Sequence, residues 1–356
     1  MQLKVAMVGP FHAEPAIGGV EQHVHHLSDA LEKEGVEVER WSWKVPQGGS
    51  GNIRGCSLLN LGKVFAETDA DLIHLHSSAI AFSLPCGLGK YERRAIATIH
   101  AFYEPMLEEG LKMKAMGLAL GPMYEAALRK TRNIAVSRYT KKEAEGRGIR
   151  VGRVIGSGIS IEELKHVEES KELESDILLV ARLNKQKGVF DFIEAFSGIA
   201  YKCLIMGYGE KGAEEKVKAL ASEKWIKFRI RPSREETLRA MKSTKVLAFP
   251  SRKESFGIVG LEAMAFGKPV IVYDEAGGPL DYVKEGYNGR VVSSRPDALK
   301  IGAADMIEDE KLMEKMRKNC IETAKAHSWE KVAKKVKEYY ESVIEQRGPA
   351  LFYRKR

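Results

Sequence analysis

The chain has 356 residues, of which 44% are hydrophobic and 30% are charged, and its formal net charge is +8. This length predicts two domains, each large enough to bury a core without disulfides. No apolar run approaches the roughly 18 residues that a membrane-spanning helix needs. The four cysteines form no Cys-x-x-Cys pair, so we expect reduced thiols in a cytoplasmic protein. The apolar run at 3–9 is too short for a signal peptide and predicts a first β-strand.

The first half of the chain alternates β-branched runs with helical patterns. A helix is predicted at 20–34, where Gly35 closes it. Strands are predicted at 3–9, 71–76, 95–100 and 133–137. Strands that alternate with helices predict a parallel sheet that is covered on both faces.

The second half repeats this alternation after a polar segment at 161–175. Strands are predicted at 177–181, 203–207, 227–230, 246–249 and 270–273. We therefore predict an α/β protein with two doubly wound, Rossmann-like domains. The domains are residues 1–165 and 166–326, and an amphipathic helix in 327–356 returns to the first domain. Ligands of such sheets bind at the carboxyl ends of the strands, so a cleft between two such edges is expected to hold the site.

Two glutamates follow the fourth predicted strand of the second half. Glu254 stands just before a helix predicted from Phe256 to Phe266, and Glu262 lies inside this helix. Gly267 suits the left-handed position that ends a helix. Glu254 therefore lies beside the free backbone N–H groups of a helix N-terminus, where a capping role is the alternative. A polyhydroxyl ligand with a charged end, such as a sugar nucleotide, would use both carboxylates and these donors.

The chain resembles the retaining glycosyltransferases of family 4, which have the GT-B fold of two Rossmann-like domains facing a central cleft. The resemblance covers nearly the whole chain and rests on the order and spacing of short motifs. These are Gly18-Gly19-Val20-Glu21, His100, Ala135-Val136-Ser137, Ala181-Arg182 to Lys187-Gly188, Gly207-Tyr208-Gly209, Glu254 to Glu262, and Gly277-Gly278-Pro279. It implies an N-terminal acceptor-binding domain and a C-terminal domain that binds a nucleotide sugar.

The resemblance implies catalytic roles for four residues: His100, Arg182, Lys187 and Glu254. Arg182 and Lys187 follow the first strand of the second half, where a guanidinium and an ammonium suit a diphosphate. In the family such a pair neutralises the leaving nucleoside diphosphate without a metal, and the equivalent of His100 faces the donor sugar. Glu254 would bind hydroxyls of that sugar, and Glu262 would bind those of the ribose.

Further residues are expected to contact the donor. Gly18 and Gly19 precede the first helix, where a glycine pair either forms a tight turn or lets backbone N–H groups approach a phosphate. A Gly-x-Gly-x-x-Gly pattern is missing there, which argues against a dehydrogenase. Arg231 lies in a loop that is expected to recognise the base. The donor-binding set is Gly18, Gly19, Gly207, Arg231, Ser255, Phe256, Gly257, Ile258, Val259 and Glu262.

Neither a metal site nor a cofactor is expected. Asp69 and Asp71 lie at the entrance of a strand, at the opposite edge from the predicted site. The following histidines have no metal-ligand spacing: His12, His23, His25, His26, His74 and His76. The family implies a front-face reaction with retention of configuration, in which the departing phosphate oxygen accepts the proton of the incoming hydroxyl.

Two segments depart from the family pattern. Asp281 stands where relatives have a glutamate, so a shorter side chain would make that contact. The interdomain segment Gly156-Ser157-Gly158-Ile159-Ser160 replaces an Asn-Gly-Ile/Val-Asp pattern. This second departure puts one hinge or nucleotide contact in question, but not the fold.

The expected partners are a UDP- or GDP-hexose and a hydroxyl acceptor. Between Leu111 and Arg153, eleven Lys and Arg residues stand against three Glu residues. A solvated face is one interpretation, and a lipid-linked or phosphorylated acceptor at an anionic membrane surface is the other. The protein would then be cytoplasmic, or peripheral at the inner face of the membrane. Nucleic acid is not expected, because no binding module is recognisable.

Two other classes of function are weighed against this one. A sugar-nucleotide epimerase or a phosphorylase on the same fold is the main alternative, and an epimerase would turn over the donor without an acceptor. A pyridoxal-phosphate phosphorylase needs a Schiff-base lysine in a recognisable context, which the sequence does not show. A binding protein without activity would have lost the set Arg182, Lys187, Glu254 and Glu262, which is present.

Overall fold

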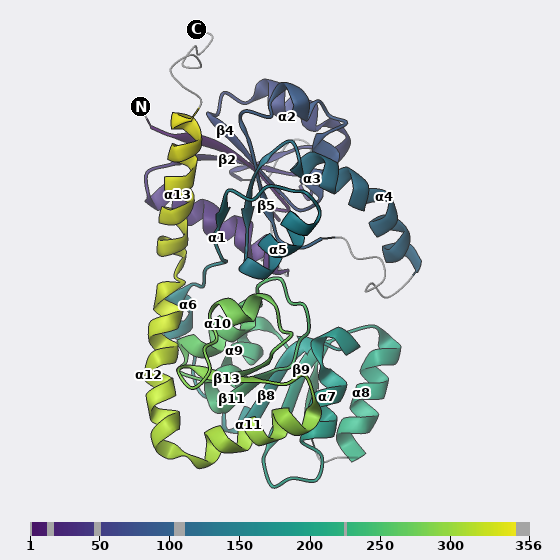
Figure 1. The fold of residues 1–356 in the computed structure, drawn as a ribbon, viewed down its shortest axis with the longest axis vertical. Coiled ribbons are helices and arrows are strands. Elements are labelled where there is room, and N and C mark those ends of the chain that lie inside the picture. Colours follow the sequence, from purple (N-terminus) through teal and green to yellow (C-terminus); the bar gives the residue numbers. More distant parts are fainter. Residues whose placement is uncertain (1, 13–17, 46–50, 103–110, 224–225, 347–356) are drawn as a thin grey trace. The chain divides into compact units, whose positions relative to one another are not determined.

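The computed structural model describes residues 2–12, 18–45, 51–102, 111–223 and 226–346. The chain divides into two compact units, which are residues 1–158 with 329–356 (unit 1) and residues 159–328 (unit 2). Each unit contains one parallel sheet, and Figure 1 shows helices around both sheets. The predicted α/β class with two Rossmann-like domains is therefore confirmed.

The sheet of unit 1 has seven parallel strands in the order β3-β2-β1-β4-β5-β6-β7. The strands are β1 (Lys4–Val8), β2 (Glu37–Ser42), β3 (Ile53–Gly55), β4 (Leu72–His76), β5 (Ala95–Ile99), β6 (Arg132–Ala135) and β7 (Arg153–Val154). The chain runs outward from β1 to β3 and then returns to the other side of β1 with β4. This reversal between β1 and β4 is the topological switch point, where ligands of open α/β sheets bind.

Alternate residues of these strands enter two separate cores. Val5 and Met7 of β1 pack with α1 (Gly19–Lys33) and α13 (Trp329–Glu345), whereas Ala6 and Val8 face the opposite core. Helices α2 (Leu61–Glu67), α3 (Ser78–Ser83), α4 (Leu111–Leu128) and α5 (Arg138–Gly146) contribute to that opposite core. Alternating directions follow from the two-residue period of a strand. The long C-terminal helix α13 thus completes the core of unit 1.

Unit 2 has six parallel strands in the order β10-β9-β8-β11-β12-β13. These are β8 (Ser175–Arg182), β9 (Cys203–Tyr208), β10 (Lys227–Ile230), β11 (Thr244–Phe249), β12 (Val270–Tyr273) and β13 (Gly289–Val292). The order repeats the pattern of unit 1, so the switch point lies between β8 and β11.

Seven α-helices among the described residues surround this sheet. They are α6 (Ile161–Lys165), α7 (Val189–Ala195), α8 (Lys211–Glu223), α9 (Arg234–Ser243), α10 (Ile258–Ala265), α11 (Pro296–Glu308) and α12 (Glu310–Ala326). One apolar core joins α7, α8, α11 and α12 to the strands, while α9 contacts β8 and β11 and α10 contacts β11 and β12. No helix in the described part of the chain is both long and apolar enough to cross a bilayer.

The observed boundaries differ from the sequence-based ones in detail. Unit 2 begins at Ile159, whereas the sequence placed the boundary near residue 165, because α6 contacts α10 of unit 2. The α10 helix begins at Ile258, two residues after the predicted start, and Gly267 has the predicted left-handed conformation with φ of 69°. Strands β2, β3, β7 and β13 were not predicted. The charged sequence of β2 and the two-residue length of β7 explain two of these omissions.

Candidate functional site

Two turns meet at the switch point of unit 2. The first follows β8 and ends at Gly188, and the second follows β11. A Cβ atom on Gly188 would lie 2.3 Å from the carbonyl oxygen of Pro250, so only glycine allows this close approach. The backbone N–H of Arg252 donates to the carbonyl of Gln186 at 2.9 Å, which ties the two turns together.

Lys187 and Glu254 form an ion pair between these two turns. Their side chains are 15% and 18% exposed, so solvent reaches both groups only partly. The Asn184 side chain accepts a hydrogen bond from the backbone N–H of Lys187 at 3.0 Å and thereby shapes the turn. The residue predicted to bind the diphosphate, Lys187, is thus paired in this structure with the residue predicted to bind the sugar, Glu254.

The main chain of Glu254 is fixed on both sides. Its N–H donates to the carbonyl of Ala276 at 2.8 Å, and its carbonyl accepts from the N–H of Gly278 at 2.7 Å. The preceding Lys253 has a positive φ of 55°, a strained conformation for a residue with a side chain. This bracing sets the direction of the Glu254 carboxylate, which is the kind of positioning that a binding site requires.

Gly257 caps the N-terminus of α10 with φ of 77°. A Cβ atom there would lie 2.6 Å from the Phe249 ring, and the Tyr282 hydroxyl donates to the Gly257 carbonyl. Phe256 is buried against the Tyr282 ring, with centroids 5.7 Å apart. Ile258, the first residue of α10, therefore starts the helix from a turn that its neighbours hold in place. The N–H groups of this helix end can donate hydrogen bonds to an anionic or hydroxyl ligand.

Glu262 is buried within α10, with its side chain 4% exposed. Its Oε1 lies 2.6 Å from a guanidinium nitrogen of Arg234, whose Nε lies 3.6 Å from Glu163. Burial disfavours the charged guanidinium, but the attraction of Glu262 and then of Glu163 outweighs this effect and raises the pKa of Arg234. Arg234 therefore stays charged and holds the carboxylate that was predicted to bind ribose.

The remaining predicted residues of unit 2 lie along the same edge of its sheet. Arg182 ends β8 and is exposed, and Gly207 lies in β9 so close to β8 that a Cβ atom would be 2.1 Å from Ala181 O. Arg231 follows β10 with φ of 50°, and its N–H donates to the Gly207 carbonyl at 2.8 Å. Its guanidinium pairs with Glu214 at 3.1 Å. Ser255 and Val259 flank the α10 start described above.

In unit 1 the predicted phosphate-binding glycines meet a carboxylate. The N–H of Gly18 donates to Glu21 Oε2 at 2.5 Å, and the other Glu21 oxygen lies 3.0 Å from His12 Nε2. Gly19 has open space around its α-carbon. A phosphate approaching Gly18 would therefore have to displace the Glu21 side chain.

His100 follows β5 and lies among other histidines at the carboxyl edge of this sheet. Its Nε2 is 3.1 Å from His76 Nδ1, and its ring centroid is 4.7 Å from that of His23. Burial lowers the pKa of His100 to about 4, so the imidazole is neutral at neutral pH. A neutral imidazole binds and positions hydroxyl groups but supplies no full positive charge.

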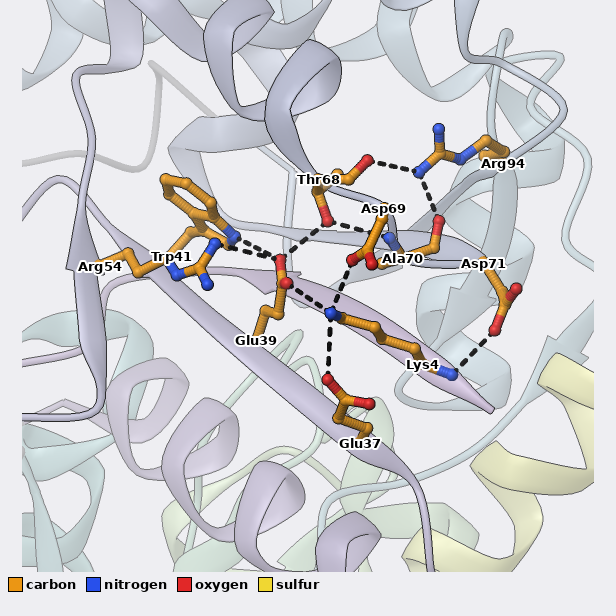
Figure 2. Close-up of polar contacts among 10 residues, drawn as sticks. All are labelled: Lys4, Glu37, Glu39, Trp41, Arg54, Thr68, Asp69, Ala70, Asp71 and Arg94. Carbon is orange, nitrogen blue, oxygen red and sulfur yellow. Dashed lines mark hydrogen bonds and ion pairs between the residues drawn. The ribbon is translucent and has the colours of Figure 1, made fainter. Parts of the chain in front are cut away.

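Asp69 and Asp71 are held by Lys4 at the amino edge of the same sheet (Figure 2). Asp69 lies 2.6 Å from Lys4 Nζ, and Asp71 accepts the backbone N–H of Lys4 at 2.9 Å. The same ammonium also contacts Glu37 and Glu39. These aspartates thus belong to an ion-pair network at the edge opposite to the switch point.

Two features of the site were not identified from the sequence. Arg234 forms an ion pair with the buried Glu262, but an arginine at the start of a polar helix gives no sequence signal of such a role. The histidines have no regular spacing, yet the fold brings ligand nitrogens of His23, His76 and His100 within 4.8 Å of one another. Parallel strand pairing is the signal that was available, since His74 and His76 in β4 lie beside the strand that His100 follows.

Two family models match consecutive parts of the chain. The model described as glycosyl transferases group 1 matches residues 160–327, and that described as glycosyltransferase family 4 matches residues 40–163. A similar relative is an uncharacterised glycosyltransferase of Methanocaldococcus jannaschii, 28% identical over 96% of this chain and 99% of its own. A D-inositol 3-phosphate glycosyltransferase of Corynebacterium urealyticum is 30% identical over 48% of this chain and 44% of its own.

Solved structures share the fold at low sequence identity. Sucrose-phosphate synthase from Thermosynechococcus elongatus has a TM-score of 0.74 and 20% identity, covering 97% of this chain and 100% of that one. Anabaena HepE, solved in complex with UDP and glucose, has a TM-score of 0.72 and 17% identity, covering 96% and 100% of the two chains. These likenesses extend over both units.

Proposed function

Since the chain belongs to the group 1 glycosyltransferases, we propose that it transfers a hexose from UDP- or GDP-hexose to a hydroxyl acceptor with retention of configuration. The observation that carries this proposal is the array of Lys187, Glu254 and Glu262 at the switch point of unit 2. The array pairs a cation for a diphosphate with two carboxylates for hydroxyl groups. The UDP complex of the similar HepE structure supports a uridine nucleotide as the first candidate.

On donor binding, Lys187 would exchange its partner Glu254 for the diphosphate of the donor. The diphosphate pairs with the ammonium of Lys187 and the guanidinium of Arg182. The released Glu254 carboxylate then accepts hydrogen bonds from hydroxyls of the sugar. Glu262 keeps its ion pair with Arg234 through one carboxylate oxygen, and its other oxygen accepts hydrogen bonds from the ribose hydroxyls. The N–H groups at the start of α10 provide donors close to Glu254.

Charge then develops on the leaving diphosphate as its bond to the anomeric carbon breaks. Arg182 and Lys187 stabilise this charge more than that of the bound donor, which lowers the barrier. The departing phosphate oxygen accepts the proton of the incoming hydroxyl, and the acceptor oxygen bonds to the anomeric carbon from the same face. His100 positions the sugar as a neutral hydrogen-bonding group. Because the two cations supply the positive charge, the reaction needs no divalent metal.

We further propose an acceptor that carries an anionic group, lipid-linked or phosphorylated. The support is the surplus of basic residues in 111–153, part of which is already neutralised, as in the 2.8 Å pair of Arg147 with Glu125. Leu118 of α4 is 68% exposed in the same region. Co-sedimentation with anionic vesicles at low salt, against neutral vesicles, separates a membrane surface from a free phosphorylated acceptor. Failure to bind either vesicles or phosphorylated sugars would remove this part of the proposal.

Thermal unfolding with UDP, GDP, ADP and their hexose derivatives, with and without EDTA, tests the donor assignment. A nucleotide at 100 times its dissociation constant stabilises the folded chain by about 2.7 kcal/mol. We expect one nucleotide to raise the midpoint equally with and without EDTA. Glu262→Ala should reduce this shift, and the exposed Glu235→Ala is the matched control. A folded protein that responds to none of the nucleotides would overturn the donor site, and the anomeric configuration of the product tests retention.

A further inference from the structure

Four histidines converge on one face of the sheet at the carboxyl edge of unit 1. His74 and His76 are two residues apart in β4 and point to the same face, where α1 supplies His23. His76 pairs in register with Thr98 of β5, so His100, two residues beyond Thr98, lies on this face as well. The ring centroids of His74 and His76 are 4.2 Å apart, and those of His76 and His100 are 5.4 Å apart.

Hydrogen bonds distinguish His74 from the other three histidines. His74 uses both nitrogens, with Tyr340 OH at 2.6 Å from Nδ1 and Thr98 Oγ1 at 2.7 Å from Nε2. His23 Nδ1 lies 3.0 Å from Ser157 Oγ, and His76 Nε2 lies 3.0 Å from Met7 Sδ. Both partners of His74 lie outside the cluster, so His74 is a structural residue, whereas His76 directs Nδ1 to His100 and His23 keeps an Nε2 that can face the cluster.

The tautomer of His76 follows from its neighbour. A thioether sulfur carries no hydrogen, so His76 Nε2 is the protonated nitrogen and Nδ1 holds the lone pair. His100 Nε2, at 3.1 Å, then donates to it in the metal-free protein. Transfer of that proton to His100 Nδ1 frees a second lone pair without a change of net charge. A metal-binding histidine usually donates a hydrogen bond from the ring nitrogen that does not bind the metal, and this bond fixes the orientation of the ring.

We propose that His23, His76 and His100 bind one divalent transition-metal ion of the zinc class, through His23 Nε2, His76 Nδ1 and His100 Nε2. Candidate ligand nitrogens of the three residues lie within 4.8 Å of one another. Tetrahedral zinc with bonds of 2.0–2.1 Å separates its ligand nitrogens by about 3.3 Å. The distance of 3.1 Å between His76 and His100 already fits, so mainly His23 must move inward.

The environment favours this class of ion over Mg²⁺ or Ca²⁺. Imidazole ligands suit zinc and its late transition-metal neighbours, whereas Mg²⁺ and Ca²⁺ prefer carboxylate and carbonyl oxygens. Burial, aided by the neighbouring histidines, lowers the pKa of His23 and His76 well below the ordinary value, and burial alone lowers that of His100. All three rings are therefore in the neutral form that binds metal at neutral pH. His100 is the least buried of the three.

Metal binding would affect transfer because it uses His100 Nε2. That ring is the one proposed to position the donor sugar, so a bound ion leaves only its Nδ1 for this contact. This consequence rests on the proposed function, whereas the existence of the site does not. Metal binding in unit 1 and nucleotide binding in unit 2 are measured separately, so the failure of one proposal is distinguishable from the failure of the other.

The test titrates chelator-treated full-length protein, without a histidine tag and without nucleotide, with Zn²⁺ by calorimetry and with Co²⁺ by visible absorption. We expect one equivalent of Zn²⁺ and the absorption bands of tetrahedral Co²⁺, which added Zn²⁺ removes. His100→Asn and His23→Gln should each weaken binding at least tenfold, because each deletes a ligand. His25→Gln, on the same helix as His23, is the matched control and should bind as the wild type does.

Two results would overturn the proposal. One is the lack of stoichiometric binding of either ion by protein whose circular dichroism shows it to be folded. The other is unchanged affinity in both His100→Asn and His23→Gln, which would place the bound ion elsewhere. His100→Asn keeps the test informative if His23→Gln does not fold, because His100 is only half-buried whereas His23 is 4% exposed.

Discussion

Six strands of the unit 1 sheet have the same order as the six strands of unit 2, but the carboxyl edges of the two sheets differ in their chemistry. In unit 1 this edge gathers buried imidazoles, which burial keeps neutral. In unit 2 it gathers full charges that neutralise one another, Lys187 with Glu254 and Arg234 with Glu262. The topology thus determines where a ligand binds, and the side chains determine whether the edge offers lone pairs or charges.

Removing the charge at the edge of unit 2 should have the largest effect. We expect Lys187→Met to lower kcat by about 10²- to 10³-fold, because one of the two groups proposed to stabilise the leaving diphosphate is lost. Lys185→Met is the control, since this lysine is exposed in the same turn. Steady-state kinetics with the donor identified by thermal shift checks both variants. A kcat within threefold of the wild type in Lys187→Met would show that this lysine does not act on the leaving group.

The histidines of unit 1 should make its stability sensitive to mild acid. Their pKa is lower in the folded state, about 3 for His74 and about 4 for His100, than the ordinary value near 6.5. The unfolded chain therefore binds more protons below about pH 6.5, and stability falls as the pH falls towards 4. Each such histidine contributes up to about 1.4 kcal/mol per pH unit within that window.

Urea unfolding between pH 7 and pH 4.5 measures this slope. His100→Asn should reduce the slope of the free energy of unfolding against pH by the contribution of about one proton, whatever its effect on stability at pH 7. His166→Gln, which replaces an exposed histidine of unit 2, is the control variant. An identical slope in His100→Asn and the wild type would mean that this imidazole is protonated in the folded state as readily as in the unfolded one.

A smaller effect is expected when the buried carboxylate of unit 2 loses its partner. Arg234→Met should lower the free energy of unfolding by about 2 kcal/mol, because Glu262 is then buried without its charged partner. Glu163→Gln removes only an exposed contact at 3.6 Å and should cost less than about 0.5 kcal/mol. Urea denaturation at pH 7 compares the variants. The double variant Arg234→Met with Glu262→Gln should recover part of the loss, and equal stability of the double and the single variant would contradict the pairing.

The sequence predicted the α/β class with two parallel sheets, most of the strands and the helix that follows Glu254, because these depend on local signals. Apolar runs mark buried strands, and Gly267 marks the end of a helix. The roles assigned to Arg182, Lys187, Glu254 and Glu262 stay predictions, although the fold brings Lys187 into contact with Glu254.

What the sequence did not show depends on contacts between distant segments. His23 and His100 are 77 positions apart, and only the pairing of β4 with β5 under α1 brings them together. The hydrogen bond from the N–H of Gly18 to the Glu21 carboxylate is a local contact, yet the glycine pair alone did not indicate it. Spacing rules for metal ligands apply to one loop or one helix, so they cannot detect a cluster that three elements assemble.

The smallest effect is expected at the amino edge of the unit 1 sheet, where the network of Figure 2 lies. Asp69→Asn removes one of three carboxylates around Lys4 Nζ, and Glu37 and Glu39 remain within 3.0 Å. Because Asp69 is 63% exposed, the free energy of unfolding should change by less than about 1 kcal/mol. Transfer activity and its response to EDTA should stay as in the wild type, since this edge lies opposite the switch point. Loss of activity that divalent cations restore would instead identify Asp69 and Asp71 as a metal-binding pair, and the contrast between the edges would then fail.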